Sequence, residues 1–234
     1  MFSNLINYNY SKTAILLFAQ SEEKESSLKP IASFSKQNVL LWKKMNGKAL
    51  KTIQNTKLPY FVSSEANQVG STFGEKITHA IEVVFANGYE KVIVVGNDCI
   101  ELKSQHLLSA ELELQVNDLI MGPDYSGGAY LIGVTKSKFI ANSFENIRWQ
   151  TKSVFTDLQS LYKTQAIAYL PCLNDCNDAF DFKRATHKLS FTDTFRKILL
   201  SFLPTSKVQY HFETLFVSCC CSASNFNKGP PLNE

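Results

Sequence analysis

The feature that most constrains this chain is a short, continuously apolar segment that ends abruptly in polar residues. Residues 91–95 carry valine or isoleucine at four successive positions, and such β-branched side chains fit a pleated sheet. An unbroken apolar run, unlike an alternating one, is typical of a strand that is buried on both faces. The run stops at Gly96-Asn97-Asp98. Asp98 is therefore expected at the carboxyl end of a central strand, where open α/β sheets bind their ligands.

Similar apolar runs, separated by stretches with helical spacing, recur along the chain. Strands are predicted at residues 13–19, 59–62, 91–95, 119–121, 129–134 and 166–170, and helices at residues 35–53, 74–85, 104–116, 151–161, 177–188 and 190–203. Because strands and helices alternate over short connections, we predict an α/β domain with a three-layer α/β/α fold and a mostly parallel sheet.

Local signals refine this outline. We expect the central strand, residues 92–95, to lie between parallel neighbours. Only a loop separates the strands at residues 119–121 and 129–134, so these two should pair antiparallel and make the sheet mixed. The polar segment at residues 21–27 is predicted to be a loop, and Ser104 is predicted to be the N-cap of the helix that follows it.

Length and composition bound the class of protein. A chain of 234 residues, 44% of them apolar, can form one α/β domain, which we predict over residues 1–203, with a C-terminal tail over residues 204–234. No apolar run is long enough for a membrane helix, and the early stretch at residues 14–19 is too short for a signal peptide, so we expect a cytoplasmic protein without a membrane partner. A net charge of +3 is too small to indicate nucleic-acid binding.

The cysteines do not indicate a zinc site. Cys99 and Cys172 lie in apolar sequence and are expected to be small buried residues. Cys172 and Cys176 have no second pair at zinc spacing. Adjacent cysteines such as Cys219-Cys220-Cys221 do not readily form disulfides with one another.

Several catalytic motifs are missing from the sequence. It has no G-x-x-x-x-G-K-[ST] loop, no G-x-G-x-x-G after a strand, no H-E-x-x-H and no G-x-S-x-G elbow. These absences disfavour a P-loop NTPase, a zinc enzyme and a nucleophilic hydrolase.

Acidic residues and glycines remain at the predicted strand ends. They are Asp98 after the central strand, Asp124 and Gly127-Gly128 between two strands, and Asp175, Asp178 and Asp181 after the last strand. Mg²⁺ prefers oxygen ligands, usually one or two carboxylates plus substrate phosphates, and Asp98 and Asp175 could supply the carboxylates. For each residue taken alone, the explanation as part of a turn or a helix cap is favoured. Their common placement at one edge of the sheet favours a site, so Asp98, Asp175 and Gly127-Gly128 are expected to converge on one cleft.

Five segments also carry a characteristic order of motifs. They are Gly70-Ser71-Thr72-Phe73-Gly74-Glu75-Lys76, Val95-Gly96-Asn97-Asp98-Cys99-Ile100, residues 122–133, Trp149-Gln150-Thr151, and Leu173-Asn174-Asp175-Cys176-Asn177. They resemble G-x-x-[LF]-G-E-R, G-[SN]-D-x-P, G-P-x-x-D-G-G-[YF]-Y-L-[IM]-G, W-x-T and L-x-D-I-D of the bacterial DUF2064 family, a nucleotide-diphospho-sugar transferase-like group often labelled glycosyltransferase. The resemblance covers residues 13–203.

The resemblance implies a Rossmann-like, nucleotide-diphospho-sugar transferase fold of the GT-A type, related to glycosyltransferases. It also implies a divalent metal, Mg²⁺ or Mn²⁺, held by Asp98 and Asp175, with Asp98 as the catalytic residue. The residues expected to bind a nucleotide or nucleotide-sugar donor are Ala19, Gln20, Gly74, Glu75, Gly96, Asn97, Gly127, Gly128, Trp149 and Thr151.

The chain departs from the family at several positions. After the first strand the family carries a basic segment, A-K-x-P-x-x-G-x-x-K-T-R, whereas residues 19–25 read AQSEEKE, and these acids would repel a phosphate group. The other replacements are Lys76 for arginine, Ile100 for proline, and Ser126 and Asn177 for acids. Asp124 could replace the acid lost at Ser126, although it lies two residues away and is expected to face differently.

Two functions follow from these observations. The first is a metal-assisted glycosyl or nucleotidyl transfer from a nucleotide-linked donor to an acceptor. The second is a catalytically degenerate family member that acts as a small-molecule or protein binding module, which the acidic segment after the first strand favours.

Overall fold

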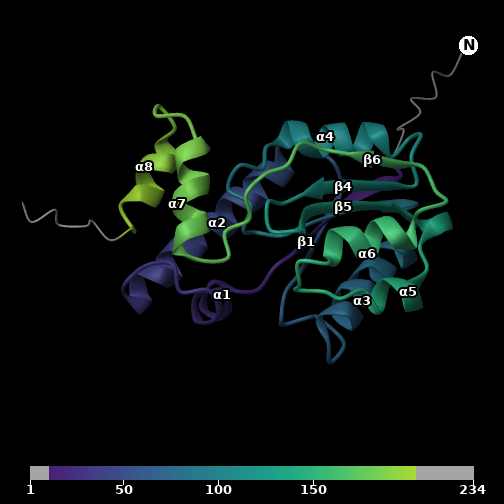
Figure 1. The fold of residues 1–234 in the computed structure, drawn as a ribbon, viewed down its shortest axis with the longest axis horizontal. Coiled ribbons are helices and arrows are strands. Elements are labelled where there is room, and N and C mark those ends of the chain that lie inside the picture. Colours follow the sequence, from purple (N-terminus) through teal and green to yellow (C-terminus); the bar gives the residue numbers. More distant parts are fainter. Residues whose placement is uncertain (1–10, 204–234) are drawn as a thin grey trace, which may run out of the picture. The chain divides into compact units, whose positions relative to one another are not determined.

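The structure, a computed structural model, describes residues 11–203. The predicted tail at residues 204–234 and Cys219-Cys220-Cys221 lie outside this part of the chain. Within it, one six-stranded sheet has the order β2-β1-β3-β5-β4-β6 (Figure 1). The strands are β1 (Thr13–Phe18), β2 (Tyr60–Ser63), β3 (Lys91–Val95), β4 (Leu119–Pro123), β5 (Ala129–Thr135) and β6 (Ile167–Tyr169).

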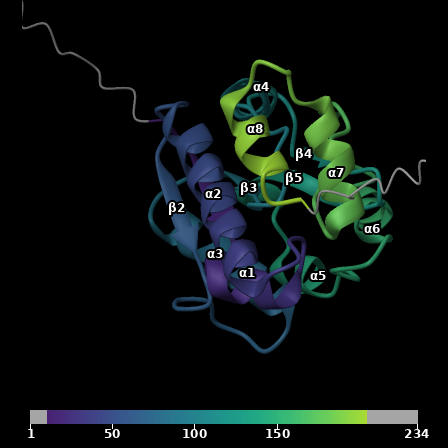
Figure 2. The ribbon, with the colours of Figure 1, turned by 90° about the vertical axis from the view of Figure 1, so that its left-hand side faces the viewer.

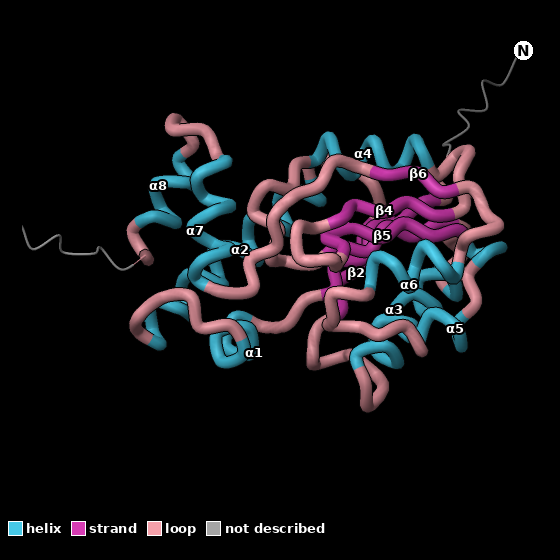
Figure 3. Tube along the Cα trace, viewed as in Figure 1, coloured by secondary structure: helices cyan, strands magenta, loops and turns pink. Residues whose placement is uncertain are grey.

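Helices cover both faces of the sheet, as the prediction of a three-layer α/β/α fold requires. They are α1 (Glu22–Leu28), α2 (Ser35–Gln54), α3 (Phe73–Ala86), α4 (Ser104–Glu113), α5 (Ala141–Glu145), α6 (Val154–Leu161), α7 (Ala179–Lys188) and α8 (Thr194–Leu200), with a 3₁₀ turn, η1 (Lys136–Lys138). One core cluster joins the sheet to α3, α5 and α6, and another joins the opposite face to α2 and α4. Figure 3 shows the strands between α4 on one side and α3, α5 and α6 on the other.

The central strand β3 explains why these layers form. Val92 and Val94 pack into the cluster on one face, and Ile93 and Val95 pack into the cluster on the other. Because side chains alternate across a strand, only an unbroken apolar run can bury both faces. The prediction of a doubly buried central strand is confirmed.

The neighbours of β3 differ in part from the prediction. β1 runs parallel to β3, but β5 runs antiparallel to it and to β4, so the expectation of parallel neighbours on both sides is wrong. The reason is the tight turn at residues 124–128, which sends β5 back along β4 and inserts it between β4 and β3. The predicted antiparallel pairing of the β4 and β5 segments is confirmed.

The segment predicted to be a polar loop is helix α1. Its N-cap is Ser21, whose Oγ accepts a hydrogen bond from the backbone N of Lys24 over 3.3 Å. Glu22, Glu23 and Glu25 lie in the first turn, where negative charge is favoured by the partial positive charge of the helix N-terminus. The acids that suggested a loop therefore stabilise the start of a helix.

Helix α4 also begins differently from the prediction. Its N-cap is Lys103, and Ser104 is the first helical residue, whose Oγ donates a hydrogen bond to the Thr52 carbonyl over 2.8 Å. Asn97 and Asp98 do not cap this helix, which removes one alternative explanation for their placement. Cys99 is buried as expected, whereas Cys172 is partly exposed.

A third cluster of apolar residues lies beyond the carboxyl ends of the parallel strands. It joins the first half of α2 to α7 and α8 through residues such as Trp42, Phe182 and Leu199. Figure 1 shows α1, α7 and α8 beyond this end of the sheet, and Figure 2 views them from there. None of the helices between residues 11 and 203 combines the length and the apolar character that crossing a membrane requires.

Candidate functional site

A cavity of about 460 Å³ opens at the carboxyl end of the sheet. Its walls come from the ends of β1 and β3, from β5, from α1 and α3, from the β4–β5 turn, from the loop before α6 and from the segment before α7. Nine of the twelve predicted site residues line it: Ala19, Gln20, Gly96, Asn97, Asp98, Gly128, Trp149, Thr151 and Asp175. The fold thus gathers segments that are distant in the sequence around one cavity, at the edge where such sheets bind ligands.

Three predicted site residues do not line this cavity. Gly74 and Glu75 start α3, where Glu75 N donates to Thr72 Oγ1 over 3.1 Å and Thr72 N donates to Glu75 Oε2 over 3.1 Å. A Cβ on Gly74 would collide with the backbone of α5. Gly127 has a φ of 90°, and a Cβ there would collide with the backbone of the loop before α6. These three residues are explained by helix capping, close packing and turn geometry.

Three aspartates line the cavity close to one another. Asp98 follows β3, Asp124 follows β4, and Asp175 lies in the segment between β6 and α7. That segment is held against both strand ends, because Cys176 N donates to the Asp98 carbonyl over 3.1 Å and Leu173 bridges to Asp124 in parallel register. Asp98, Asp175 and Gly128 are therefore brought together, as expected, and Asp124 joins them.

Two further acids of this region have local roles. Asp178 Oδ1 accepts hydrogen bonds from the backbone N of Phe180 and of Asp181, each over 2.8 Å, and so caps α7. Asp181 pairs with Arg184 at 3.0 Å on the same helix. Asp178 is therefore a helix cap, as the alternative explanation has it, and Asp181 belongs to an ion pair within α7.

Asp124 shapes the turn that separates β4 from β5. Its Oδ1 accepts hydrogen bonds from the backbone N of Ser126 over 2.6 Å and of Gly128 over 2.8 Å. Both Asp124 and Ser126 line the cavity. Asp124 thus supplies an acid to the cavity that Ser126 cannot, contrary to the expectation that it faces elsewhere.

Asp175 is the most perturbed of the three carboxyls. Its Oδ1 is buried and has no hydrogen-bond partner among the described residues. Burial, and then the negative charges of Asp98 and Asp124, raise the pKa of Asp175 well above its ordinary value. A proton on Asp175 therefore relieves the repulsion between acids that the fold places side by side.

Lys29, at the end of α1, supplies positive charge to this cluster. Its Nζ lies 2.6 Å from Asp98 Oδ2, and the two side chains are only 25% and 19% exposed. Burial opposes the charge on Lys29, but the carboxylates of Asp98, Glu25 and Asp175 outweigh that effect and raise its pKa above the ordinary value. The ammonium group is therefore permanently charged and held by Asp98.

Glu25 adds a further acid to the cavity from the inner face of α1. Burial raises the pKa of Glu25, Lys29 lowers it, and Asp98 raises it again. The charged side chains that line the cavity in the described chain are four acids, Glu25, Asp98, Asp124 and Asp175, and two lysines, Lys29 and Lys152. The cavity therefore has an excess of acidic groups.

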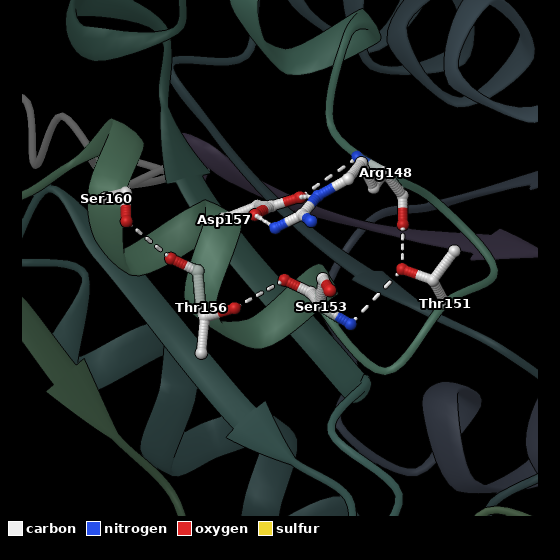
Figure 4. A network of polar contacts seen from close by, with 6 residues as sticks. All are labelled: Arg148, Thr151, Ser153, Thr156, Asp157 and Ser160. Carbon is white, nitrogen blue, oxygen red and sulfur yellow. Dashed lines mark hydrogen bonds and ion pairs between the residues drawn. The ribbon is translucent and has the colours of Figure 1, made fainter.

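An aromatic wall forms part of the cavity. Phe73 and Trp149 line it, with ring centroids 5.5 Å apart. The loop that carries Trp149 is fixed by Arg148, whose Nε and Nη2 donate to Asp157 Oδ2 over 2.9 Å and to Oδ1 over 2.6 Å (Figure 4). Thr151 Oγ1 donates to the Arg148 carbonyl over 2.6 Å, which closes the same loop. An aromatic surface held in this way can stack against a flat ring of a ligand.

Lys29 and Glu25 are the main residues that sequence reasoning missed. A signal for Lys29 was present, because counting the family's pattern A-K-x-P-x-x-G-x-x-K-T-R from Ala19 places Lys29 between its second lysine and its arginine. The prediction of a loop at residues 21–27 hid this, since only a helix orients Glu25 and Lys29 toward the same space.

The donor groups around the cavity bear on the predicted metal. Between residues 11 and 203 no group of three or more His, Cys, Asp or Glu side chains is arranged to hold a metal ion. Asp98 is one of the two predicted ligands, and its Oδ2 already forms an ion pair with Lys29 Nζ. In this arrangement the residues do not fit a divalent metal.

Comparison with solved structures defines the class of fold. A candidate nucleotide-diphospho-sugar transferase from Desulfovibrio desulfuricans G20 matches with a TM-score of 0.72 at 21% identity, over 82% of this chain and 95% of that one. A candidate glucose-1-phosphate thymidylyltransferase from Bacillus anthracis matches with a TM-score of 0.41 at 9% identity, over 78% and 98%. Rv0371C from Mycobacterium tuberculosis H37Rv, in a crystal structure with manganese, matches with a TM-score of 0.43 at 7% identity, over 76% of this chain and 99% of that one. The first likeness shows that the chain has the nucleotide-diphospho-sugar transferase fold.

Sequence comparison identifies the family. The model of DUF2064, described as "Uncharacterized protein conserved in bacteria", matches residues 34–151, just over half of the 234-residue chain. The chain belongs to the DUF2064 family. None of the curated proteins matches it.

Proposed function

We propose that this chain binds a nucleotide-linked donor, such as a nucleotide sugar, in the cavity and transfers its glycosyl or nucleotidyl group to an acceptor. The observation that carries this proposal is the cavity itself, which combines the Lys29–Asp98 pair with an aromatic wall at the carboxyl edge of the sheet. Its volume of about 460 Å³ lies in the range typical of small-molecule sites. The name of the Desulfovibrio structure with this fold supports the donor class.

Different residues of the cavity are suited to contact the base and the phosphates of a donor. Trp149 offers a stacking surface for the base, and Gly128 leaves room for the Asp124 carboxylate, which a Cβ at this position would meet. Lys29 supplies positive charge for phosphate oxygens, on which negative charge develops as the leaving group departs. Asp98 holds that ammonium group in place. Burial and the neighbouring acids raise the pKa of Asp175, so among the three aspartates it is the one that most readily takes up a proton and donates it in a hydrogen bond to an oxygen of the donor.

Thermal unfolding with a panel of donors tests the binding part of the proposal. A ligand that binds only the folded state raises the melting temperature, by an amount that grows with its concentration. We expect at least one nucleotide sugar or nucleoside diphosphate to do so, while a nucleoside without phosphate has less effect. The titration is run with EDTA, Mg²⁺ and Mn²⁺, which tests the family-based expectation of a metal. The proposal fails if no compound of the panel shifts the melting temperature under any of the three conditions.

Substitution of Asp98 tests the transfer part. Asp98→Asn deletes the charge that fixes Lys29, and we expect the rate of group transfer to fall by about 10²-fold or more. The measurement is hydrolysis of the donor that stabilises the protein, with water as the acceptor. It releases nucleoside diphosphate and sugar if the glycosyl group is transferred, and nucleoside monophosphate and sugar phosphate if the nucleotidyl group is transferred. The control is Glu90→Gln, which removes an exposed acid paired with Lys12 before β3, at the opposite end of the strand. Equal rates in the two variants would contradict a catalytic role for Asp98.

A second candidate function is a binding module without catalysis. The excess of acids in the cavity favours it, because acids weaken the binding of a phosphorylated donor. The same assay separates the two: a binding module is stabilised by its ligand but forms no free nucleotide from it.

A further inference from the structure

We propose that Lys29 is the resident cation of this site: its ammonium group takes the place of the divalent metal that a metal-dependent transferase would hold. The chain therefore binds donor phosphates without a metal ion. This inference rests on the proposed function, because it concerns how the same cavity takes an anionic diphosphate. Its basis is the disagreement between the metal that the family implies and the groups that the fold brings together.

The geometry gives Asp98 a cation already. Lys29 Nζ is 2.6 Å from Asp98 Oδ2, within the range of a charge-assisted hydrogen bond. Glu25 and Asp175 act electrostatically on the same ammonium group. Mg²⁺ is usually held by one or two carboxylates and by substrate phosphates, and Lys29 has the corresponding neighbours on the protein side. A lysine ammonium is itself a standard point-charge ligand for phosphate.

The backbone and the ammonium group of Lys29 also contact other residues. Its carbonyl oxygen accepts hydrogen bonds from Trp42 Nε1 and from Asn38 Nδ2, each over 3.1 Å. Its backbone N donates to the Glu25 carbonyl over 2.8 Å. The ammonium group lies 5.7 Å from the centre of the Trp42 ring, a favourable cation–π distance. A residue fixed at both its backbone and its charged end is not easily displaced.

A metal would have to displace Lys29 from Asp98. The displaced ammonium would lose its carboxylate partner within a largely buried site, and it would face a second positive charge nearby. Removal of Lys29 has the opposite effect, because Glu25, Asp98, Asp124 and Asp175 would then share the cavity without that cation. Metal binding should therefore appear only when Lys29 is neutralised.

The experiment measures Mn²⁺ binding and UDP binding separately. Wild type, Lys29→Met, Lys29→Arg and Lys24→Met are compared, the last as a control because Lys24 is an exposed lysine of the same helix. Free Mn²⁺ is followed by electron paramagnetic resonance without nucleotide, and UDP binding is followed by calorimetry in EDTA or Mn²⁺. Circular dichroism and the melting temperature show whether each variant is folded.

We expect wild type, Lys24→Met and Lys29→Arg to bind no Mn²⁺ at millimolar concentration and to bind UDP equally in EDTA and in Mn²⁺. Lys29→Met should bind Mn²⁺, bind UDP at least tenfold more weakly in EDTA, and recover part of that loss with Mn²⁺. Stoichiometric Mn²⁺ binding by wild type, or UDP binding that requires Mn²⁺, would overturn the proposal even if Lys29→Met does not fold.

The design also separates this inference from the proposed function. If wild type binds neither UDP, GDP nor dTDP while Lys29→Met alone binds Mn²⁺, the donor proposal fails and Lys29 is supported as the resident cation. If wild type binds a nucleoside diphosphate only together with Mn²⁺, the donor proposal stands and the inference about Lys29 is wrong.

Discussion

The protonation of Asp175 depends on what the fold packs around one carboxyl group. In an unfolded chain an aspartate titrates near pH 4. In the fold, burial and the charges of Asp98 and Asp124 raise the pKa of Asp175 well above that. The native state therefore binds more protons than the unfolded state between the two pKa values. The contribution of Asp175 to stability is full below about pH 4 and is lost as the pH rises through the raised pKa.

The resulting prediction concerns the slope of stability against pH. The free energy of unfolding of wild type should fall as the pH rises above about 4, and this fall should be smaller in Asp175→Asn, whose amide cannot ionise. Glu25, whose pKa is also raised, leaves a residual fall in the variant. Urea denaturation at a series of pH values measures both profiles. In Asp157→Asn the fall should remain, because Arg148 lowers the pKa of Asp157. Parallel profiles of wild type and Asp175→Asn would contradict this account.

At the scale of elements, helix α1 changes how the acidic segment after β1 would act on a bound phosphate. As a loop, the segment would present all its acids to a bound phosphate. As a helix, it turns Glu23 to solvent and buries Glu25, and of Glu22, Glu23 and Glu25 only Glu25 lines the cavity. The repulsion expected from the whole segment is therefore concentrated at one residue.

A matched pair of variants tests this. Glu25→Gln should tighten the binding of a nucleoside diphosphate several-fold, because it removes a buried acid near Lys29, whereas Glu23→Gln should change binding little. Calorimetric titrations at two salt concentrations measure the effect. The gain from Glu25→Gln should persist at high salt, since buried charges are screened less than exposed ones. If Glu23→Gln tightens binding as much as Glu25→Gln, the orientation of α1 described here is wrong.

At the scale of the whole described domain, the third apolar cluster couples stability to the site. Phe182 of α7 is fully buried in this cluster, and α7 follows directly after the segment that carries Asp175. Helices packed across the carboxyl end of the sheet therefore hold one of the three cavity aspartates in place.

The corresponding prediction uses two phenylalanines of the same helix. Phe182→Ala should lower the free energy of unfolding by about 3–5 kcal/mol, because it leaves a cavity in a packed cluster. Phe180 is 71% exposed, and Phe180→Ala should cost no more than about 0.5 kcal/mol. Urea denaturation compares the two. Similar losses would mean that α7 does not pack on α2 and α8 as described.

Much of this architecture follows from the sequence alone. The strand at residues 91–95 could be recognised because β-branched side chains at successive positions leave no polar face, so the segment must be buried on both sides. The spacing of apolar residues likewise predicted the helices that cover the sheet. Asp98 and Asp175 could be placed at strand ends, because the carboxyl ends of parallel strands meet at one edge. These are properties of a residue and its sequence neighbours.

Tertiary structure decided the rest. Gly74 and Glu75 lie within a motif block, yet they cap and pack α3, since a motif does not say whether a residue faces a ligand or its own backbone. The insertion of β5 next to β3 depends on which strands pair, and pairing is a long-range choice. Lys29 meets Asp98 only because α1 turns back over the end of β3, across 69 residues of sequence. The sequence by itself determined the layers of the fold and the placement of acidic residues at one edge of the sheet. The net charge at that edge depends on contacts between distant segments, and these contacts exist only in the folded chain.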